Sequence, residues 1–152
     1  MRTGLVVLAM AVAAPVAAQM PAPAASVKLA DARGAADAVF SACPDLHLAV
    51  AVLDAGGGDK LVVTGDGTWG RMADFARRKA MTAMTFAKPS SAVRDEAKAD
   101  AALAERLKSD PKLIGFGGGF PLGAGGAFAV AGAPGQEIDE RCARAGLALL
   151  GG

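Results

Sequence analysis

A run of glycines in the C-terminal half most narrows the folds open to this chain. Seven glycines lie between Gly115 and Gly126. Within strands, glycine marks bulges, tight bends and places where another backbone approaches closely. We therefore predict a pair of strands here, residues 113–121 and 127–132, joined by a turn at residues 123–126.

Hydrophobic spacing and turn residues define the other elements. We predict helices over residues 29–43, 71–87 and 91–108, a hairpin of strands 46–53 and 60–64, and a last helix that follows Pro134 and Gly135. The resulting order is α-β-β-α-α-β-β-α. Runs of neighbouring strands favour an antiparallel sheet flanked by helices, which is an α+β fold rather than a doubly wound parallel one.

The N-terminus has the pattern of an export signal. Arg2 is the only charge before the apolar run from Leu5 to Ala14, and small residues follow that run. We predict a signal peptide over residues 1–18, a flexible Pro/Ala-rich lead over 19–27 and a single domain over 28–152. The alternative is an uncleaved anchor, but the run is shorter than the ~20 residues that span a bilayer. The expected location is the periplasm or the cell exterior, without membrane insertion after cleavage.

The charge balance of the processed chain excludes two classes of partner. The sequence holds 16 Lys and Arg residues against 15 Asp and Glu residues, and removal of Arg2 leaves 15 of each. A formal charge of zero gives no steering toward nucleic acid or anionic lipid, because both reward a basic surface. We therefore expect a small-molecule ligand rather than a polyanion.

Two cysteines form the only pair that could cross-link the domain. Cys43 and Cys142 each lie on the apolar stripe of a predicted helix, the first and the last. Antiparallel packing of those helices would bring the two thiols together, and an exported protein keeps disulfides. Such a bond would close a loop of about 100 residues, worth ~4 to 5 kcal/mol in the chain-entropy model. The alternative is two unpaired, buried thiols.

Few side chains are suited to metal binding or catalysis. The chain has one histidine, His47, and no tyrosine, so a zinc site is excluded and no catalytic triad is recognisable. His47 is the only strong nitrogen ligand for a haem iron, although a half-buried strand histidine is the ordinary reading. Lys79 follows Met72 by two helical turns and Phe75 by one, so we expect it to lean toward the protein or a neighbouring subunit.

The glycine run itself lacks the pattern of a phosphate loop. No Gly-Lys-Ser/Thr follows residues 115–121, and no predicted helix starts there. Structural glycines are the simpler reading, but close backbone approach to a flat ligand stays open. Phe116 is then a candidate ligand-binding residue.

Taken together, four segments resemble the GlcG/HbpS family, which includes the C-terminal domain of PduO-type proteins. They are residues 50–57, residues 76–83 with Phe86 and Pro89-Ser90, residues 117–121 and residues 139–146. The resemblance implies a profilin-like or PAS-like sheet, homo-oligomers and haem binding. It also implies that the hydroxyl of Ser90 lies near the iron. Met81 stands where the family commonly has an aromatic residue, so a stacking surface is lost there while a thioether ligand is gained.

These observations lead to a first hypothesis and two alternatives. The first is an exported haem-binding protein, a sensor or scavenger with a partner protein and no catalysis of its own. Its apolar site would be formed by His47, Lys79, Met81, Ser90 and Phe116, with His47 and Ser90 as iron ligands. The alternatives are a periplasmic module that binds or senses a small organic acid, and an enzyme that degrades haem.

Overall fold

The computed structural model describes residues 26–123 and 125–151. The predicted signal peptide lies outside this range, as does the lead up to residue 25. Val27, at the end of that lead, is buried among the core residues, so ordered packing begins by that position. Within the described ranges, no helix has both the length and the apolar character needed to cross a membrane.

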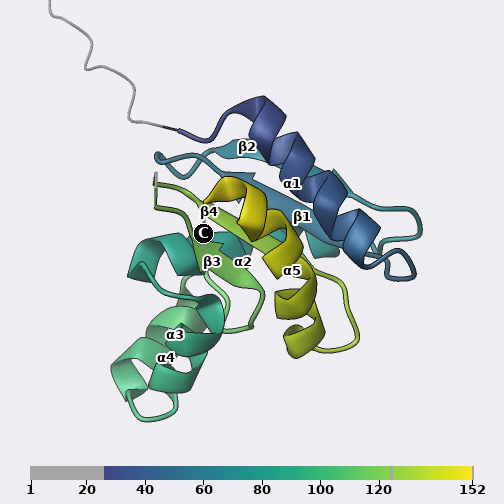
Figure 1. The fold of residues 1–152 in the computed structure, drawn as a ribbon. Helices are drawn as coiled ribbons and strands as arrows, with labels where there is room; N and C mark the ends of the chain where they lie inside the picture. Colours follow the sequence, from purple (N-terminus) through teal and green to yellow (C-terminus); the bar gives the residue numbers. More distant parts are fainter. Residues whose placement is uncertain (1–25, 124, 152) are drawn as a thin grey trace, which may run out of the picture.

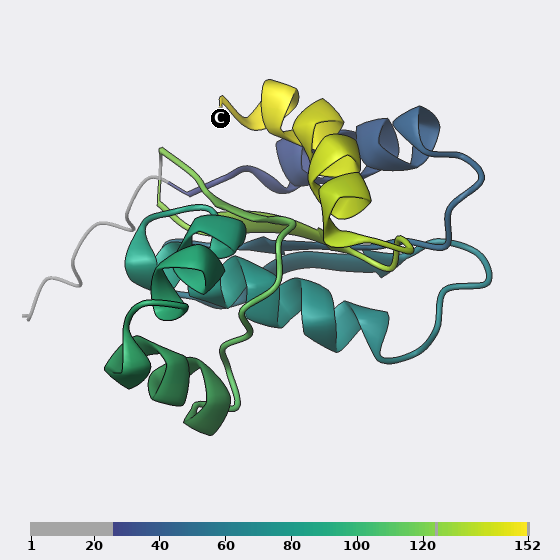
Figure 2. The same cartoon turned by 90° about the horizontal axis from the view of Figure 1, so that it is seen from below.

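The predicted α+β class and element order are confirmed. The described elements are α1 (Leu29–Ala42), β1 (Ala49–Leu53), β2 (Asp59–Thr64), α2 (Met72–Phe86), α3 (Ser90–Ala97), α4 (Ala101–Ser109), β3 (Gly119–Pro121), β4 (Ala127–Ala131) and α5 (Gln136–Leu150). Their strands form one antiparallel sheet in the order β2-β1-β4-β3. Helices α1 and α5 cover one face of the sheet, and α2 covers the other (Figures 1 and 2).

Side-chain alternation along β1 distributes the core between these two layers. Leu48, Val50 and Val52 belong to the large cluster with α1 and α5. Ala49 and Ala51 point to the opposite face, toward Ala76 of α2. Both faces are buried, as the apolar character of successive residues in this strand requires.

The predicted helix over residues 91–108 is two helices in the structure. Asp100 interrupts it, because its carboxylate accepts a hydrogen bond from the backbone N–H of Leu103 at 3.0 Å and so caps a new helix, α4. Alanine-rich periodicity hides such a cap. The order of elements is unchanged: α3 packs against α2, and α4 packs against α3.

The predicted strand over residues 113–121 is shorter than expected. Only its last three residues pair with β4. The preceding segment is held by side chains of α2 instead: Arg78 donates to the carbonyl of Leu113, and the hydroxyl of Thr82 accepts from the N–H of Ile114 at 2.9 Å. These hydrogen bonds hold the segment against α2, where it forms one wall of the site described below.

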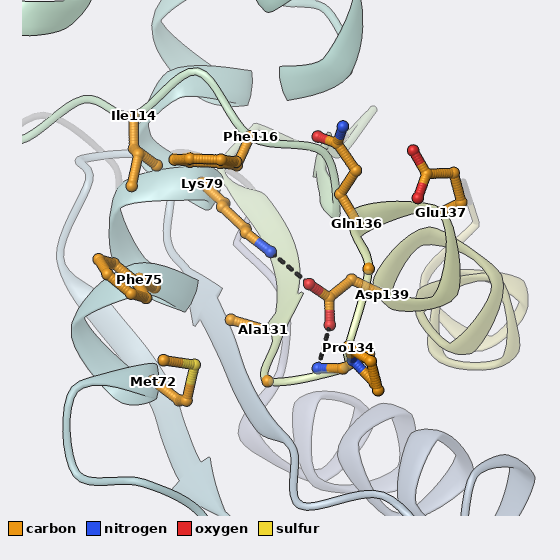
Figure 3. A pocket seen from close by; sticks show the side chains of 13 residues that line it. Met72, Phe75, Lys79, Ile114, Phe116, Ala131, Pro134, Gln136, Glu137 and Asp139 are labelled. Atoms are coloured by element: carbon orange, nitrogen blue, oxygen red, sulfur yellow. Dashed lines mark hydrogen bonds and ion pairs between the residues drawn. The ribbon is translucent and has the colours of Figure 1, made fainter.

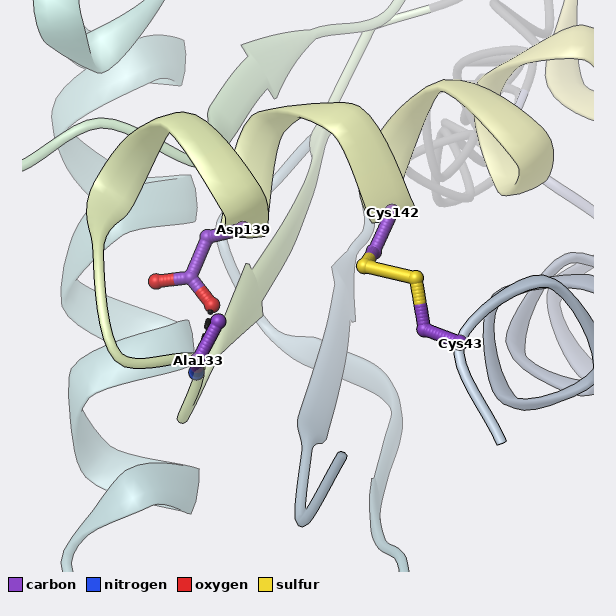
Figure 4. The surroundings of a disulfide bond; sticks show 4 residues. All are labelled: Cys43, Ala133, Asp139 and Cys142. Atoms are coloured by element: carbon purple, nitrogen blue, oxygen red, sulfur yellow. Dashed lines mark hydrogen bonds between the residues drawn. A yellow bond between two sulfur atoms is a disulfide. The ribbon is translucent and has the colours of Figure 1, made fainter. Parts of the chain in front are cut away.

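The predicted disulfide is confirmed. Cys43, at the C-terminal cap of α1, bonds to Cys142 in α5 across a sequence separation of 99. Figure 4 shows the bond joining the end of one helix to the first half of the other, as antiparallel packing requires. Asp139 lies one helical turn before Cys142, so this bond also fixes the part of α5 that faces the site.

Candidate functional site

A cavity of about 430 Å³ opens between α2, the segment before β3 and the start of α5. Its size is typical of sites for small molecules. Most of its walls are apolar, and a few polar side chains reach it from α5 (Figure 3). The lining residues are Met72, Phe75, Lys79, Ile114, Phe116, residues 131–136, Glu137 and Asp139.

Lys79 extends from α2 across the inner end of this cavity. Its ammonium nitrogen Nζ lies 2.6 Å from Oδ2 of Asp139 and donates to the carbonyl of Val130 at 3.1 Å. Figure 3 shows the side chain directed at the Asp139 carboxylate. Only 5% of Lys79 and 4% of Asp139 are exposed. The prediction that Lys79 leans toward the protein agrees with this placement.

Burial acts on both members of this ion pair. Loss of hydration lowers the pKa of Lys79, and the nearby carboxylates of Asp139 and Glu140 oppose that shift only in part. Loss of hydration also raises the pKa of Asp139, against the attraction of Lys79 and the hydrogen bond from the N–H of Ala133. Both shifts act in the same direction. Compared with bulk water, this site favours the neutral pair, an amine beside a carboxylic acid.

Two glycines let the chain close over Lys79. Gly118 has a φ of 112°, and a Cβ there would lie 2.6 Å from the carbonyl oxygen of Val130 and 3.2 Å from Nζ of Lys79. A Cβ on Gly119 would collide with the carbonyl of Lys79 itself. Only glycine therefore fits where the chain crosses this lysine, which gives the glycine run its structural reason.

Two aromatic rings, those of Phe75 and Phe116, line the cavity, and the cation of Arg71 lies beside Phe75. Phe116 is 55% exposed although it lines the cavity. On the other side, the guanidinium carbon of Arg71 lies 5.7 Å from the ring centroid of Phe75 and 5.6 Å from that of Trp69. Trp69 is itself 61% exposed. A flat apolar ligand would cover these rings and leave its charged edge beside Arg71.

Ser90 is buried beneath the site rather than in its lining. Its side chain is fully buried, and its hydroxyl accepts a hydrogen bond from the N–H of Gly119 at 2.9 Å. That bond ties the N-terminus of α3 to the beginning of β3. The structure therefore gives Ser90 a role in holding the glycine run, while its predicted place near an iron stays a prediction.

Met81 faces a different hollow. It lies with Leu53, Gly57 and Arg77 around a separate depression of about 290 Å³ on the other side of α2. One helical turn of α2 cannot present Lys79 and Met81 to the same cavity, because two positions differ by about 200° around the axis. The structure thus brings Lys79 and Phe116 together and leaves Met81 apart.

His47 lies at the same end of the sheet as the cavity but outside its lining. The backbone of His47 adjoins Gly132, a wall residue, while the imidazole Nδ1 lies 2.7 Å from the carbonyl oxygen of Asp66. When Nδ1 donates its proton to that carbonyl, Nε2 is left as a free acceptor. Metal-binding histidines commonly have this arrangement.

Asp139, the partner of Lys79, is not among the predicted site residues. A signal was present: Asp139 precedes Cys142 by three residues and Gly146 by seven, so it lies on the inward stripe of α5. A carboxylate on a buried stripe requires a partner, and Lys79 was the one cation already predicted to point inward. Among the described residues, no group of three or more His, Cys, Asp and Glu side chains could hold a metal ion.

Comparison with known proteins identifies the family. The family model described as haem degrading protein HbpS-like matches residues 27–148, and this chain belongs to that family. A double mutant of HbpS from Streptomyces reticuli is 35% identical, with 93% of this chain and 99% of that protein covered and a TM-score of 0.77. The GlcG/HbpS resemblance of the sequence is thereby confirmed. No curated protein matches the chain.

Two more distant structures share the fold. Protein ORFY of Klebsiella pneumoniae is 22% identical over 91% of this chain and 98% of its own, with a TM-score of 0.75. PduOC, solved as a complex with haem, is 21% identical over 82% of this chain and 94% of its own, with a TM-score of 0.72. At these identities the likeness establishes the fold alone.

Proposed function

We propose that this protein is an exported haem-binding protein that senses or scavenges haem without catalysis of its own. The observation that carries the proposal is an exposed phenylalanine, Phe116, over an apolar cavity in a member of the HbpS-like family. A structural relative, PduOC, has been solved with haem. Haem is flat and apolar with two charged propionates at one edge, so it needs what this cavity mouth offers.

The residues of the cavity fit such a ligand. Met72, Phe75, Ile114 and Phe116 supply an apolar and aromatic wall. Arg71, exposed beside Phe75, would pair with a propionate, since guanidinium and carboxylate groups form strong charge-assisted hydrogen bonds. Lys79 is already paired with Asp139 and is not needed for that purpose.

Two side chains could supply a ligand to the iron. The thioether of Met72 lines the cavity, and thioethers are known axial ligands of haem. The Nε2 atom of His47 is the stronger donor, and its ring is already oriented by the carbonyl of Asp66. We infer that Phe116 would contact the haem and Met72 would supply the ligand to its iron within the cavity, and that His47 is the alternative donor.

Export and the absence of catalysis rest on different observations. Export is supported by the signal pattern of residues 1–18 and by the Cys43–Cys142 bond, since structural disulfides persist outside the cytoplasm. The absence of catalysis rests on the sequence, which has one histidine, no tyrosine and no recognisable catalytic triad. The description of the family model names haem degradation, so turnover is a direct alternative.

Titration with hemin tests the proposal. Saturable binding should appear as a shifted Soret band. Phe116→Ala should weaken the affinity by up to about tenfold, because an aromatic pair contributes about 0.5–1.5 kcal/mol and 1.4 kcal/mol corresponds to a factor of ten. Leu149→Ala is the matched control, since Leu149 is 59% exposed on α5 and does not line the cavity. An unshifted Soret band would end the haem proposal.

Further variants separate the ligands and test for turnover. Met72→Leu keeps the volume of the side chain and removes its sulfur, whereas His47→Ala and Ser90→Ala remove the other two predicted donors. If the Soret maximum changes only in the Met72→Leu variant, Met72 is the iron ligand and haem lies in the cavity. If it changes only in the His47→Ala variant, His47 is the iron ligand and haem lies outside the cavity. Loss of the Soret band with product release in the presence of a reductant would replace the binding role with haem degradation.

A further inference from the structure

The cavity contains a reactive group that haem binding does not use. The amine of Lys79 is buried, yet Lys79 and its partner Asp139 both line the cavity. Lysines elsewhere in the described chain, such as Lys88 and Lys98, have side chains that are 50% and 70% exposed. Lys79 is therefore placed unlike these lysines, with its nitrogen between a carboxylate and an enclosed apolar space.

A purely structural ion pair explains this arrangement less well. Burying two charges costs several kcal/mol, and replacing a buried pair by apolar side chains is often neutral or stabilising. Helix α5 is already fixed by the Cys43–Cys142 bond and by core contacts of Ala143 and Leu147. The fold thus has other means to hold α5, whereas the cavity has no other amine among its lining residues.

We propose that Lys79 captures small aldehydes by forming a reversible imine, with Asp139 as the group that carries protons for the reaction. The geometry supports this because Oδ2 of Asp139 lies 2.6 Å from Nζ. Oδ1 of the same carboxylate accepts a hydrogen bond from the N–H of Ala133 at 3.0 Å, which fixes its orientation. A nucleophile held against an acid/base group is the arrangement that covalent capture of a carbonyl requires.

The reaction conserves atoms and charge. A proton moves from the ammonium of Lys79 to Asp139, and the neutral amine then forms a bond to the carbonyl carbon. The carbonyl oxygen takes a proton from Asp139, and the nitrogen returns one to Asp139, which gives a carbinolamine. Asp139 next protonates the hydroxyl, which leaves as water while the nitrogen lone pair forms the C=N bond. The protonated imine ends beside the Asp139 carboxylate, as the ammonium began.

The surroundings of Lys79 define the class of aldehyde. Met72, Phe75 and Phe116 offer an apolar wall, which suits an aromatic or aliphatic body. Glu137 lines the mouth, and the charge of Glu140 also acts on Lys79. One carboxylate oxygen of Glu140, Oε1, is buried without a hydrogen-bond partner among the described residues. An additional negative charge is disfavoured here, so uncharged aldehydes should bind better than keto or aldehydo acids.

Reductive trapping tests the proposal on the protein without haem. The protein is incubated at pH 7 with benzaldehyde and cyanoborohydride, which reduces imines, and labelled lysines are located by peptide mass mapping. An ordinary lysine with a pKa near 10.4 has about one neutral amine in 2,500 at this pH. Because burial lowers the pKa of Lys79, we expect Lys79 to be labelled at least about tenfold faster than Lys88 or Lys98.

Three controls make the outcome decisive. Lys79→Arg keeps the charge and cannot form the imine, so it should abolish the fast label, whereas Lys88→Arg should leave it unchanged. Asp139→Asn should slow labelling at Lys79 about 100-fold, the usual contribution of a positioned acid/base group. Glyoxylate should label Lys79 more slowly than benzaldehyde. Label confined to exposed lysines, or equal label in the Lys79→Arg protein, overturns the proposal even when hemin still binds.

Discussion

The two faces of the sheet are packed in different ways. On the face of α1 and α5, one continuous cluster contains large buried side chains such as Val39, Val50 and Phe128. On the face of α2, the buried residues are mostly alanines, including Ala76, Ala80 and Ala129, in two smaller clusters. Figure 2 shows the sheet edge-on with these two helical layers on either side.

This difference separates stability from ligand binding. Large side chains remove much apolar surface from water, and the disulfide reinforces the same face. Alanines let α2 approach the sheet closely, and its longer residues, Met72, Phe75 and Lys79, line the cavity beside the end of β4. Substitutions on the first face should therefore affect folding, and substitutions around the cavity should affect binding.

The same substitution on the two sides gives the largest contrast. Phe128→Ala should lower the free energy of unfolding by about 4 kcal/mol, because Phe128 is fully buried and its loss leaves a cavity. Phe116→Ala should change it by less than about 0.5 kcal/mol, because Phe116 is 55% exposed. Urea unfolding of the two variants measures both values. Equal losses would mean that the cavity wall is part of the folding core.

Removal of the disulfide should have the next largest effect. The double variant Cys43→Ala/Cys142→Ala should lose about 3 kcal/mol, because the bond closes a long loop in the unfolded chain and disulfides commonly deliver less than the ~4 to 5 kcal/mol of the chain-entropy model. The measurement is urea unfolding with and without a reductant. A reductant should destabilise the wild type and leave the double variant unchanged. If the reductant leaves the urea midpoint of the wild type unchanged, the disulfide does not make the expected contribution to stability.

Local patterns predicted most of the fold. The stripe from Leu29 to Cys43, the alternation of residues 46–53 and the glycine run each depend on neighbouring residues, so they gave the element order and the disulfide. Two boundaries were wrong for a tertiary reason. The cap at Asp100 and the bonds from Arg78 and Thr82 to residues 113–114 override the local preference of those segments.

The site was predicted only in part, because it depends on contacts between distant segments. Lys79 was expected to point inward from its spacing with Met72 and Phe75, and Phe116 was expected from the glycine run. Asp139 lies 60 positions from Lys79, and no local pattern pairs them. Ser90, Met81 and His47 came from the resemblance or from their ligand chemistry. The structure puts them beneath, behind and beside the cavity.

The ion pair in the cavity should have the smallest but most diagnostic effect on stability. In the double variant Lys79→Met/Asp139→Leu, two buried charges are replaced by apolar side chains of similar size, so the variant should be at least as stable as the wild type at pH 7. Its advantage should be about 1 kcal/mol, measured from urea midpoints at pH 5, 7 and 9. The control is Lys88→Gln/Glu96→Gln, which removes an exposed ion pair. Its stability should differ little from that of the wild type at each pH.

The pH dependence follows from the two pKa shifts. Burial raises the pKa of Asp139 above its ordinary value of 3.8. The stability that this shift contributes is complete below pH 3.8 and is lost as the pH rises through the folded-state pKa. Burial lowers the pKa of Lys79 below 10.5. The stability that this shift contributes is complete above pH 10.5 and is lost as the pH falls through the folded-state pKa. Between pH 3.8 and pH 10.5 both losses act on the wild type, so the stability advantage of the double variant should be greatest within this range and should decline below and above it. A wild type that gains on the variant near pH 7 would mean that the pair is held as ions, which would leave Lys79 without the neutral amine that capture of an aldehyde requires.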